Sequence, residues 1–169
     1  MIGRIKNIIL KKYMDFRLKW FKADKQPLEF SSALKLVKNI LLIAPVDHAE
    51  LDEDVHHFAS ELYKIIENVR VSTFERSTFR PDDGNWFGLP NDSYMDNFRQ
   101  ENFDLVIDLN VEQDRLCTYI CALSGAGLRI NLTSGKYDHI YNFHIRSNES
   151  KTVSARFESI LKYLRSFIK

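Results

Sequence analysis

The sequence of 169 residues has little of what would assign a function directly. It holds two cysteines and only six glycines, and no glycine-rich segment opens a helix as a phosphate-binding loop does. Its apolar runs are too short to span a bilayer. The N-terminus has neither the apolar core nor the small-residue cleavage site of a secretion signal. These absences predict a cytoplasmic protein with no transmembrane segment.

The sequence also gives little support for a disulfide bond or a metal site. Cys117 and Cys121 lie four residues apart on a predicted helix, a poor geometry for a disulfide, so we expect two buried free thiols. His48, Asp52 and His56 recur every four residues, but the two histidines would be roughly 12 Å apart along a helix. That is too far for one tetrahedral ion without further ligands. The sequence predicts no metal site and no cofactor.

Charge is balanced overall but unevenly placed. The net charge is +1, and the apolar (44%) and charged (28%) fractions are those of a globular protein of about one domain. Residues 1–22 carry seven lysines and arginines against the single acid Asp15, a net charge of +6, so the remaining chain carries −5. Because the basic charge is confined to one segment, nucleic acid is a poor candidate partner.

A βαβ unit is the clearest pattern in the chain. Residues 102–110 form a short, continuous apolar run that ends in Asp108 and Asn110, as a strand buried on both faces does. Residues 112–123 have helical spacing, and a glycine-rich stop at 124–127 precedes a second apolar run at 128–132. Strand, helix and strand in so few residues predict a parallel sheet.

The remaining pattern completes a single Rossmann-like three-layer α/β domain. We predict a mostly parallel sheet of about five strands, with 40–44 and 105–109 at its centre and helices on both faces. An amphipathic helix is appended at residues 1–22, and the domain proper spans 23–169. The predicted strands are 39–44, 69–74, 103–109, 128–132 and 141–145, and the predicted helices are 2–21, 31–37, 50–68, 93–101, 112–123 and one from about 150 to the C-terminus.

The central segment resembles a known enzyme family. Residues 102–110 (NFDLVIDLN), a helix and then Gly-Ala-Gly-Leu-Arg-Ile at 125–130 are similar to the N-terminal half of ADP-heptose:lipopolysaccharide heptosyltransferases. That resemblance implies a glycosyltransferase-like fold that binds a nucleotide or nucleotide-sugar. The chain departs from the family at Pro45–Ala49, where a Gly-Asp pair is usual, and at Asn110-Val111, where Gln-Gly is usual. The family's nucleotide-sugar site belongs to a second domain that these residues do not include, so no catalytic role carries over.

The organisation of the whole chain resembles a second family. A basic N-terminal helix, one α/β domain, the segment Ala122–Ala126 at a helix end and a C-terminal helix are together similar to small uncharacterised proteins of Bacteroidota. This resemblance implies a bacterial source and the same fold, with no assigned activity.

Ligands of open parallel sheets bind beyond the carboxyl ends of the strands. Asp47 and His48 follow the first core strand, and Asp108, Asn110 and Gln113 lie at the end of the central one. They are candidates for ligand binding or acid–base chemistry, and the alternative is that Asp47 and Asn110 cap helices beside a solvated His48. The loop 82–90 adds Trp86, which either binds a sugar or peptide or fills a hydrophobic cluster under the loop.

The N-terminal helix offers a second candidate surface. Its apolar residues recur at intervals of three and four among lysines and arginines, which fits an interfacial membrane helix, a helix that docks on a protein, or a helix packed on its own domain. We expect the second half of the helix, from Tyr13, to pack against its own domain and the first half to contact a membrane or a partner. The candidate contact residues are Ile2, Ile5, Ile9, Lys6 and Lys12.

These observations predict a non-catalytic binding or interaction module. In that hypothesis the N-terminal helix docks to a membrane surface or a protein partner, so that the protein is cytoplasmic and peripheral to the inner membrane. The alternative is a nucleotide- or nucleotide-sugar-binding domain that uses the residues at the strand ends. Enzymatic activity is the less favoured interpretation.

Overall fold

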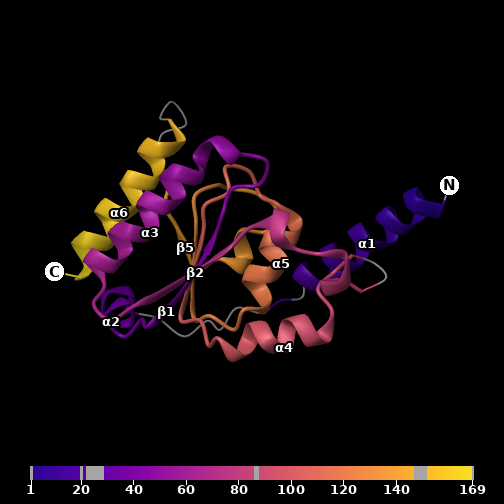
Figure 1. The fold of residues 1–169 in the computed structure, drawn as a ribbon, viewed down its shortest axis with the longest axis horizontal. Coiled ribbons are helices and arrows are strands. Elements are labelled where there is room, and N and C mark those ends of the chain that lie inside the picture. Colours follow the sequence, from indigo (N-terminus) through magenta and orange to yellow (C-terminus); the bar gives the residue numbers. More distant parts are fainter. Residues whose placement is uncertain (1, 20, 22–28, 86–87, 147–151, 169) are drawn as a thin grey trace.

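Five parallel strands form one sheet in the order β2-β1-β3-β4-β5 (Figure 1). The computed structural model describes residues 2–19, 21, 29–85, 88–146 and 152–168. Strands β1 and β3 both lie in the interior of the sheet, as the sequence predicts. The strands are β1 (Asn39–Ile43), β2 (Arg70–Phe74), β3 (Leu105–Asp108), β4 (Leu128–Asn131) and β5 (Phe143–His144).

Helices cover both faces of the sheet, which confirms the predicted three-layer α/β fold. One face packs against α2, α3 and α6, and the other packs against α1, α4 and α5. The helices are α1 (Ile2–Lys19), α2 (Phe30–Lys35), α3 (Asp52–Ile65), α4 (Asp92–Gln100), α5 (Arg115–Leu123) and α6 (Val153–Ile168), with short 3₁₀ turns η1 (Ala49–Leu51), η2 (Arg76–Thr78), η3 (Pro81–Asp83) and η4 (Asp138–Ile140).

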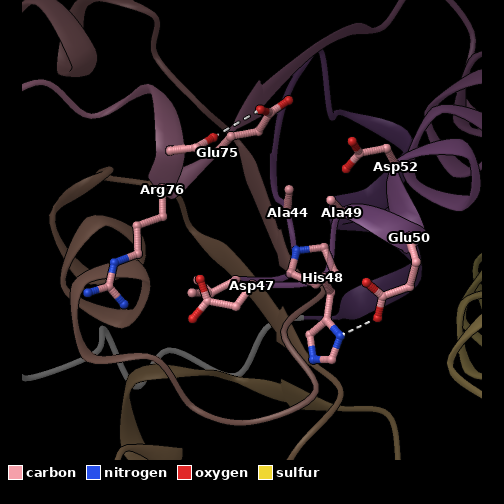
Figure 2. Close-up of a pocket in the computed structure, with 11 residues that line it drawn as sticks. Ala44, Asp47, His48, Ala49, Glu50, Asp52, Glu75 and Arg76 are labelled. Carbon is pink, nitrogen blue, oxygen red and sulfur yellow. Dashed lines mark hydrogen bonds and ion pairs between the residues drawn. The ribbon is translucent and has the colours of Figure 1, made fainter.

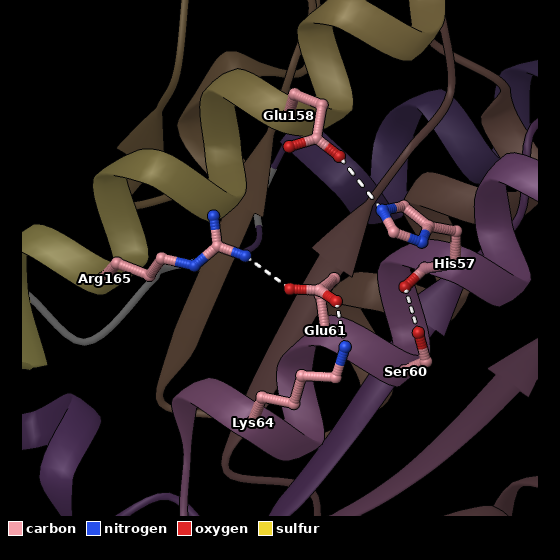
Figure 3. A network of polar contacts seen from close by, with 6 residues as sticks. All are labelled: His57, Ser60, Glu61, Lys64, Glu158 and Arg165. Atoms are coloured by element: carbon pink, nitrogen blue, oxygen red, sulfur yellow. Dashed lines mark hydrogen bonds and ion pairs between the residues drawn. The ribbon is translucent and has the colours of Figure 1, made fainter.

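The two faces of the sheet differ in polarity. The cluster under α2, α3 and α6 consists of apolar side chains, and a rim of ion pairs closes it: Glu61 of α3 accepts from Arg165 of α6 at 2.5 Å, and His57 lies 3.2 Å from Glu158 (Figure 3). Since His57 and Glu158 are more than half exposed and Arg165 is 44% exposed, the rim adds little to stability beside the buried core. The buried polar residues belong to the opposite side: Asp108, Asn110, Thr118, Ser124, Arg129 and Asn131.

Helix boundaries follow from capping groups. The helix predicted at 112–123 begins only at Arg115, because the side chain of Asp114 accepts a hydrogen bond from the Cys117 amide at 2.9 Å and so fixes the N-terminus there. It ends where predicted, since Gly125 follows with a φ of +80°.

Two other predicted elements are shorter in the structure. The helix predicted at 50–68 divides into the turn η1 and α3, and its last residues leave the helix before Asn68, whose φ is +55°. The strand predicted at 141–145 shrinks to Phe143–His144, which pairs with β4 at the edge of the sheet. Periodicity alone places neither boundary, since both depend on local backbone geometry.

Candidate functional site

The loops after β1, β2 and β3 surround the point at which the strand order reverses. A cleft of 680 Å³ lies between the loop that follows β1 and the turn that follows β2 (Figure 2). A second cleft of 350 Å³ runs from residues 46–48 past Arg76 to residues 110–114. Folds with this strand order bind ligands at this place, because the loops on either side of the reversal diverge.

Two of the predicted ligand residues, Asp47 and His48, line both clefts. Asp47 is exposed and has a φ of +59°, a left-handed conformation that is uncommon outside glycine. The His48 ring is turned toward Glu50, and its Nδ1 lies 2.7 Å from the Glu50 carboxylate, which lowers the pKa of Glu50 (Figure 2). Turn η1 begins after His48 without a side-chain cap, so the capping role considered for Asp47 is wrong.

Asp108 and Asn110 are buried and bonded to neighbouring groups. The Asn110 side chain donates to Asp108 at 2.7 Å and accepts from the Val46 amide at 2.8 Å, while the Tyr141 hydroxyl donates to Asp108 at 2.5 Å. Burial raises the pKa of Asp108, although the hydrogen bonds from Tyr141 and Asn110 act in the opposite direction. Asn110 caps no helix, since Asp114 does so. These two side chains therefore tie the loop after β1 to the end of β3.

Gln113 lines the second cleft but is also engaged. Its amide oxygen accepts from the Tyr137 amide at 3.0 Å, and its amide nitrogen donates to Asp138 at 2.8 Å. Asp108 is absent from the lining of both clefts among the described residues, and Trp86 lies outside those residues. The structure thus gathers Asp47, His48, Asn110 and Gln113 at the clefts.

The charge around the clefts is mostly negative. Arg76 is the guanidinium between them, and it is paired with Asp114 at 2.6 Å. A polyphosphate would meet repulsion here, whereas a neutral or cationic ligand would not. The acids that line the two clefts are Asp47, Glu50, Asp52, Glu75, Glu112 and Asp114.

The described residues give no structural support for thiol or metal chemistry. Cys117 and Cys121 are buried as free thiols, and burial raises the pKa of both, which suppresses the reactive thiolate. In the part of the chain that the structure describes, no three His, Cys, Asp or Glu residues gather as a metal would require.

Helix α1 packs on the domain through one row of apolar side chains. Met14 (3% exposed) and Leu18 (1%) are buried in the same cluster as Tyr119 and Ala122 of α5, with Leu10 partly buried beside them. The second half of the helix therefore packs on its own domain as predicted, but only through this row, because Tyr13 and Phe16 of the same half are exposed. This packed row is distinct from Ile5 and Ile9, the apolar residues that the sequence predicts for external contact.

A polar clamp around Asp15 holds the same side of α1. The Asp15 carboxylate accepts from Lys136 at 2.7 Å, from Arg115 at 3.2 Å and from the hydroxyl of Tyr137. Near the end of the helix, the Nε2 of His139 lies 2.5 Å from the Leu18 carbonyl oxygen. The sequence offered one signal of this clamp, which is that Asp15 is the single acid among seven cations.

The other side of α1 is exposed. Rows at i, i+4 and i+8 run parallel on a helix, and rows five residues apart lie about 140° around its axis. Leu10, Met14 and Leu18 form the packed row, and Ile5, Ile9 and Tyr13 form the exposed one. Figure 1 shows the N-terminal half of α1 projecting away from the sheet. The exposed fractions are Ile5 54%, Ile8 56%, Ile9 46%, Tyr13 44% and Phe16 60%.

The predicted contact residues therefore divide into two groups. Ile5, Ile9 and Lys12 are exposed on α1. Ile2 and Lys6 belong to the same helix, but their side chains lie outside the described part of the chain.

Comparison with known proteins identifies the family. A model of a family of unknown function, DUF6913, matches residues 6–167, almost the whole chain, and the chain belongs to that family. No curated protein and no solved structure matches it. Among the described residues, no helix is long and apolar enough to cross a membrane.

Proposed function

We propose that this member of the DUF6913 family is a binding module whose helix α1 docks on an anionic membrane surface. The observation that carries the proposal is the apolar side of α1. Five of the eight large apolar or aromatic side chains that are exposed among the described residues lie on this single helix. Scattered surface apolar residues are normal, but a continuous row is typical of an interaction site.

The positive charge of the helix indicates what binds to this surface. Residues 1–22 carry a net charge of +6, and Lys12, Arg17 and Lys19 are exposed among the apolar residues. A helix of this kind lies in the plane of a membrane, with its apolar side at the acyl boundary and its cations among anionic headgroups. A second copy of the same helix would bring like charges together. Anionic lipid therefore complements this surface better than self-association does.

The packed row gives the docking a mechanical basis. Because Met14, Leu18 and the Asp15 clamp attach α1 to α5 and η4, a membrane contact made by Ile5 and Ile9 would hold the whole domain at the surface. Each basic residue near an anionic surface contributes about 1 kcal/mol, and each inserted isoleucine contributes a similar amount. The predicted location, cytoplasmic and peripheral to the inner membrane, would follow from such reversible binding.

Vesicle co-sedimentation of the full chain tests the proposal. We expect binding to phosphatidylcholine vesicles that contain about a third phosphatidylglycerol, little binding to pure phosphatidylcholine, and weakening by salt because screening acts over about 8 Å at physiological ionic strength. The double variant Ile5→Ser, Ile9→Ser should bind at least about tenfold more weakly, since it removes most of the inserted apolar area.

Leu36→Ser is the matched control. Leu36 is 77% exposed and lies just after α2, so its replacement removes an apolar side chain even more exposed than Ile5 or Ile9 from a different surface. It should leave vesicle binding unchanged. Absence of binding to anionic vesicles at low salt, or equal losses in the two variants, would contradict the proposal.

A ligand site in the clefts is the second candidate function. The specific observation in its favour is that four sequence-predicted residues line clefts at the reversal of strand order. The acidic lining favours a neutral or amine-bearing ligand over the nucleotide or nucleotide-sugar suggested by the likeness to heptosyltransferases, which remains a prediction. A thermal-shift panel of nucleotides, nucleotide-sugars, neutral sugars and amines separates these classes, because a ligand at 100 times its Kd adds about 2.7 kcal/mol.

A further inference from the structure

A pocket lies beside the exposed apolar row, between α1 and the segment that leads into η4. Its volume is 630 Å³, and Phe16 is common to the pocket wall and the exposed side of α1. The pocket is therefore continuous with the surface that the proposed function places at a membrane. Its wall is formed by Lys12, Phe16 and Lys19 of α1 and by Lys136, Tyr137 and His139 across from them.

The cations of this pocket outnumber its acids. Asp15 is the carboxylate in the wall, and its charge is already engaged by Lys136 and by Arg115 behind it. Within the described part of the chain, neither Lys12 nor Lys19 has an intramolecular hydrogen-bond or ion-pair partner. Two ammonium groups are thus available at the pocket while its one carboxylate is neutralised.

The position of the two lysines on the helix also suits contact with lipid headgroups. Lys12 and Lys19 are seven residues apart and share one side of α1, about 50° around the axis from the line of Ile5, Ile9 and Phe16. If that line rests on the acyl boundary, both side chains extend along the headgroup layer, as lysines do at interfaces. The pocket then opens toward the headgroups rather than the bulk solvent.

We infer that this pocket takes the headgroup of a phosphomonoester lipid, with Lys12 and Lys19 on the phosphate and Lys136 at its edge. A phosphomonoester carries about −1.5 to −2 charges at neutral pH, whereas a phosphodiester headgroup such as phosphatidylglycerol carries one negative charge. A group with several acceptor oxygens suits several convergent ammonium donors. The inference rests on the proposed membrane docking and adds the lipid class.

The test compares phosphatidate with phosphatidylglycerol in vesicles matched for surface charge. The wild-type chain should bind phosphatidate vesicles at least about fivefold more tightly. The double variant Lys12→Gln, Lys19→Gln should lose this preference. Its control, Lys11→Gln with Lys35→Gln, removes the same charge from exposed positions outside the pocket wall, and it should keep the preference while binding all anionic vesicles somewhat less.

Each contrary outcome has its own meaning. Equal binding to both charge-matched vesicles, or equal loss of preference in both double variants, would overturn the headgroup assignment and leave general docking intact. Binding to no anionic vesicle would overturn the proposed function itself. Glycerol 3-phosphate that raises the melting temperature of the wild type, without any preference for phosphatidate vesicles, would overturn the assignment to a lipid.

Discussion

The two sides of helix α1 are chemically similar but end in different surroundings. Leu10, Met14 and Leu18 form one apolar row, and Ile5, Ile9 and Tyr13 form another with the same spacing. The first row is in contact with α5 and the second is exposed. Hydrophobicity therefore does not decide which row the domain covers.

Polar anchors decide it instead. Asp15 lies next to the packed row, and its bonds to Arg115, Lys136 and Tyr137 fix the rotation of the helix about its axis. A helix turned the other way would leave this carboxylate without those partners. One acid in a basic helix can thus determine which of two apolar faces packs on the domain, which leaves the second face for another partner.

Truncation gives the largest expected difference between the rows. Among the described residues, removal of 1–22 deletes the buried side chains of Met14 and Leu18, worth about 1.5–3 kcal/mol each, which approaches the total stability of a small domain of about 5–15 kcal/mol. Removal of residues 1–9 deletes no described buried side chain and should cost below about 1 kcal/mol. Urea unfolding followed by far-ultraviolet circular dichroism measures both. Equal stability of the two truncated chains would show that α1 is no part of the core.

Single substitutions sharpen the same comparison. Leu18→Ala creates a cavity and should lower the free energy of unfolding by about 2–5 kcal/mol. Ile9→Ala, on the exposed row, should change it by less than about 0.5 kcal/mol, because alanine favours the helix and little packing is lost. The order should reverse for vesicle binding, where Ile9→Ala weakens the interaction and Leu18→Ala, assayed while folded, does not. The same order in both assays would remove the distinction between the rows.

Local patterns predicted the fold because they carry its main determinants. The apolar run at 105–109, the helical spacing after it and the stop at Gly125 are all read within some twenty-five residues, and together they identify the βαβ unit. The interior position of β1 and β3 follows from their continuous apolar character.

The site was harder to predict because its contacts are distant in sequence. In the sequence, Asp108 has the position of an accessible acid at the end of a strand. In the structure it is buried, and the hydroxyl of Tyr141, thirty-three residues later, donates a hydrogen bond to it. Asp15 meets Tyr137 across 122 positions, and nothing in periodicity signals such a pair. The two apolar rows of α1 have equal spacing, so the sequence pattern alone does not indicate which of them packs on the domain. The long-range partners of Asp15 determine it.

Loss of the Asp15 charge should have a smaller effect than loss of Leu18. The two cations that pair with Asp15 are solvent-accessible, Arg115 at 34% and Lys136 at 64%, so Asp15→Asn should cost about 1 kcal/mol or less and mainly loosen α1. Faster hydrogen exchange of the α1 amides would report that loosening. Asp96→Asn removes an exposed pair with Arg99 and is the control, with almost no expected change. An equal effect of both variants would reduce the clamp to an ordinary surface ion pair.

The pH dependence of the clamp is the smallest effect and the most specific. Burial alone would raise the pKa of Asp15, but hydrogen bonds from Lys136 and Tyr137 and the charge of Arg115 outweigh it and lower the pKa below the usual 3.8. A carboxyl with a lowered folded pKa stabilises the fold above its unfolded pKa, and this contribution disappears as the pH falls through the folded value. The difference in unfolding free energy between wild type and Asp15→Asn should therefore stay constant from about pH 7 to 5 and shrink below about pH 4. Urea unfolding of both proteins across this range measures it, and a difference that already shrinks between pH 7 and 5 would mean that a group other than Asp15 governs the clamp.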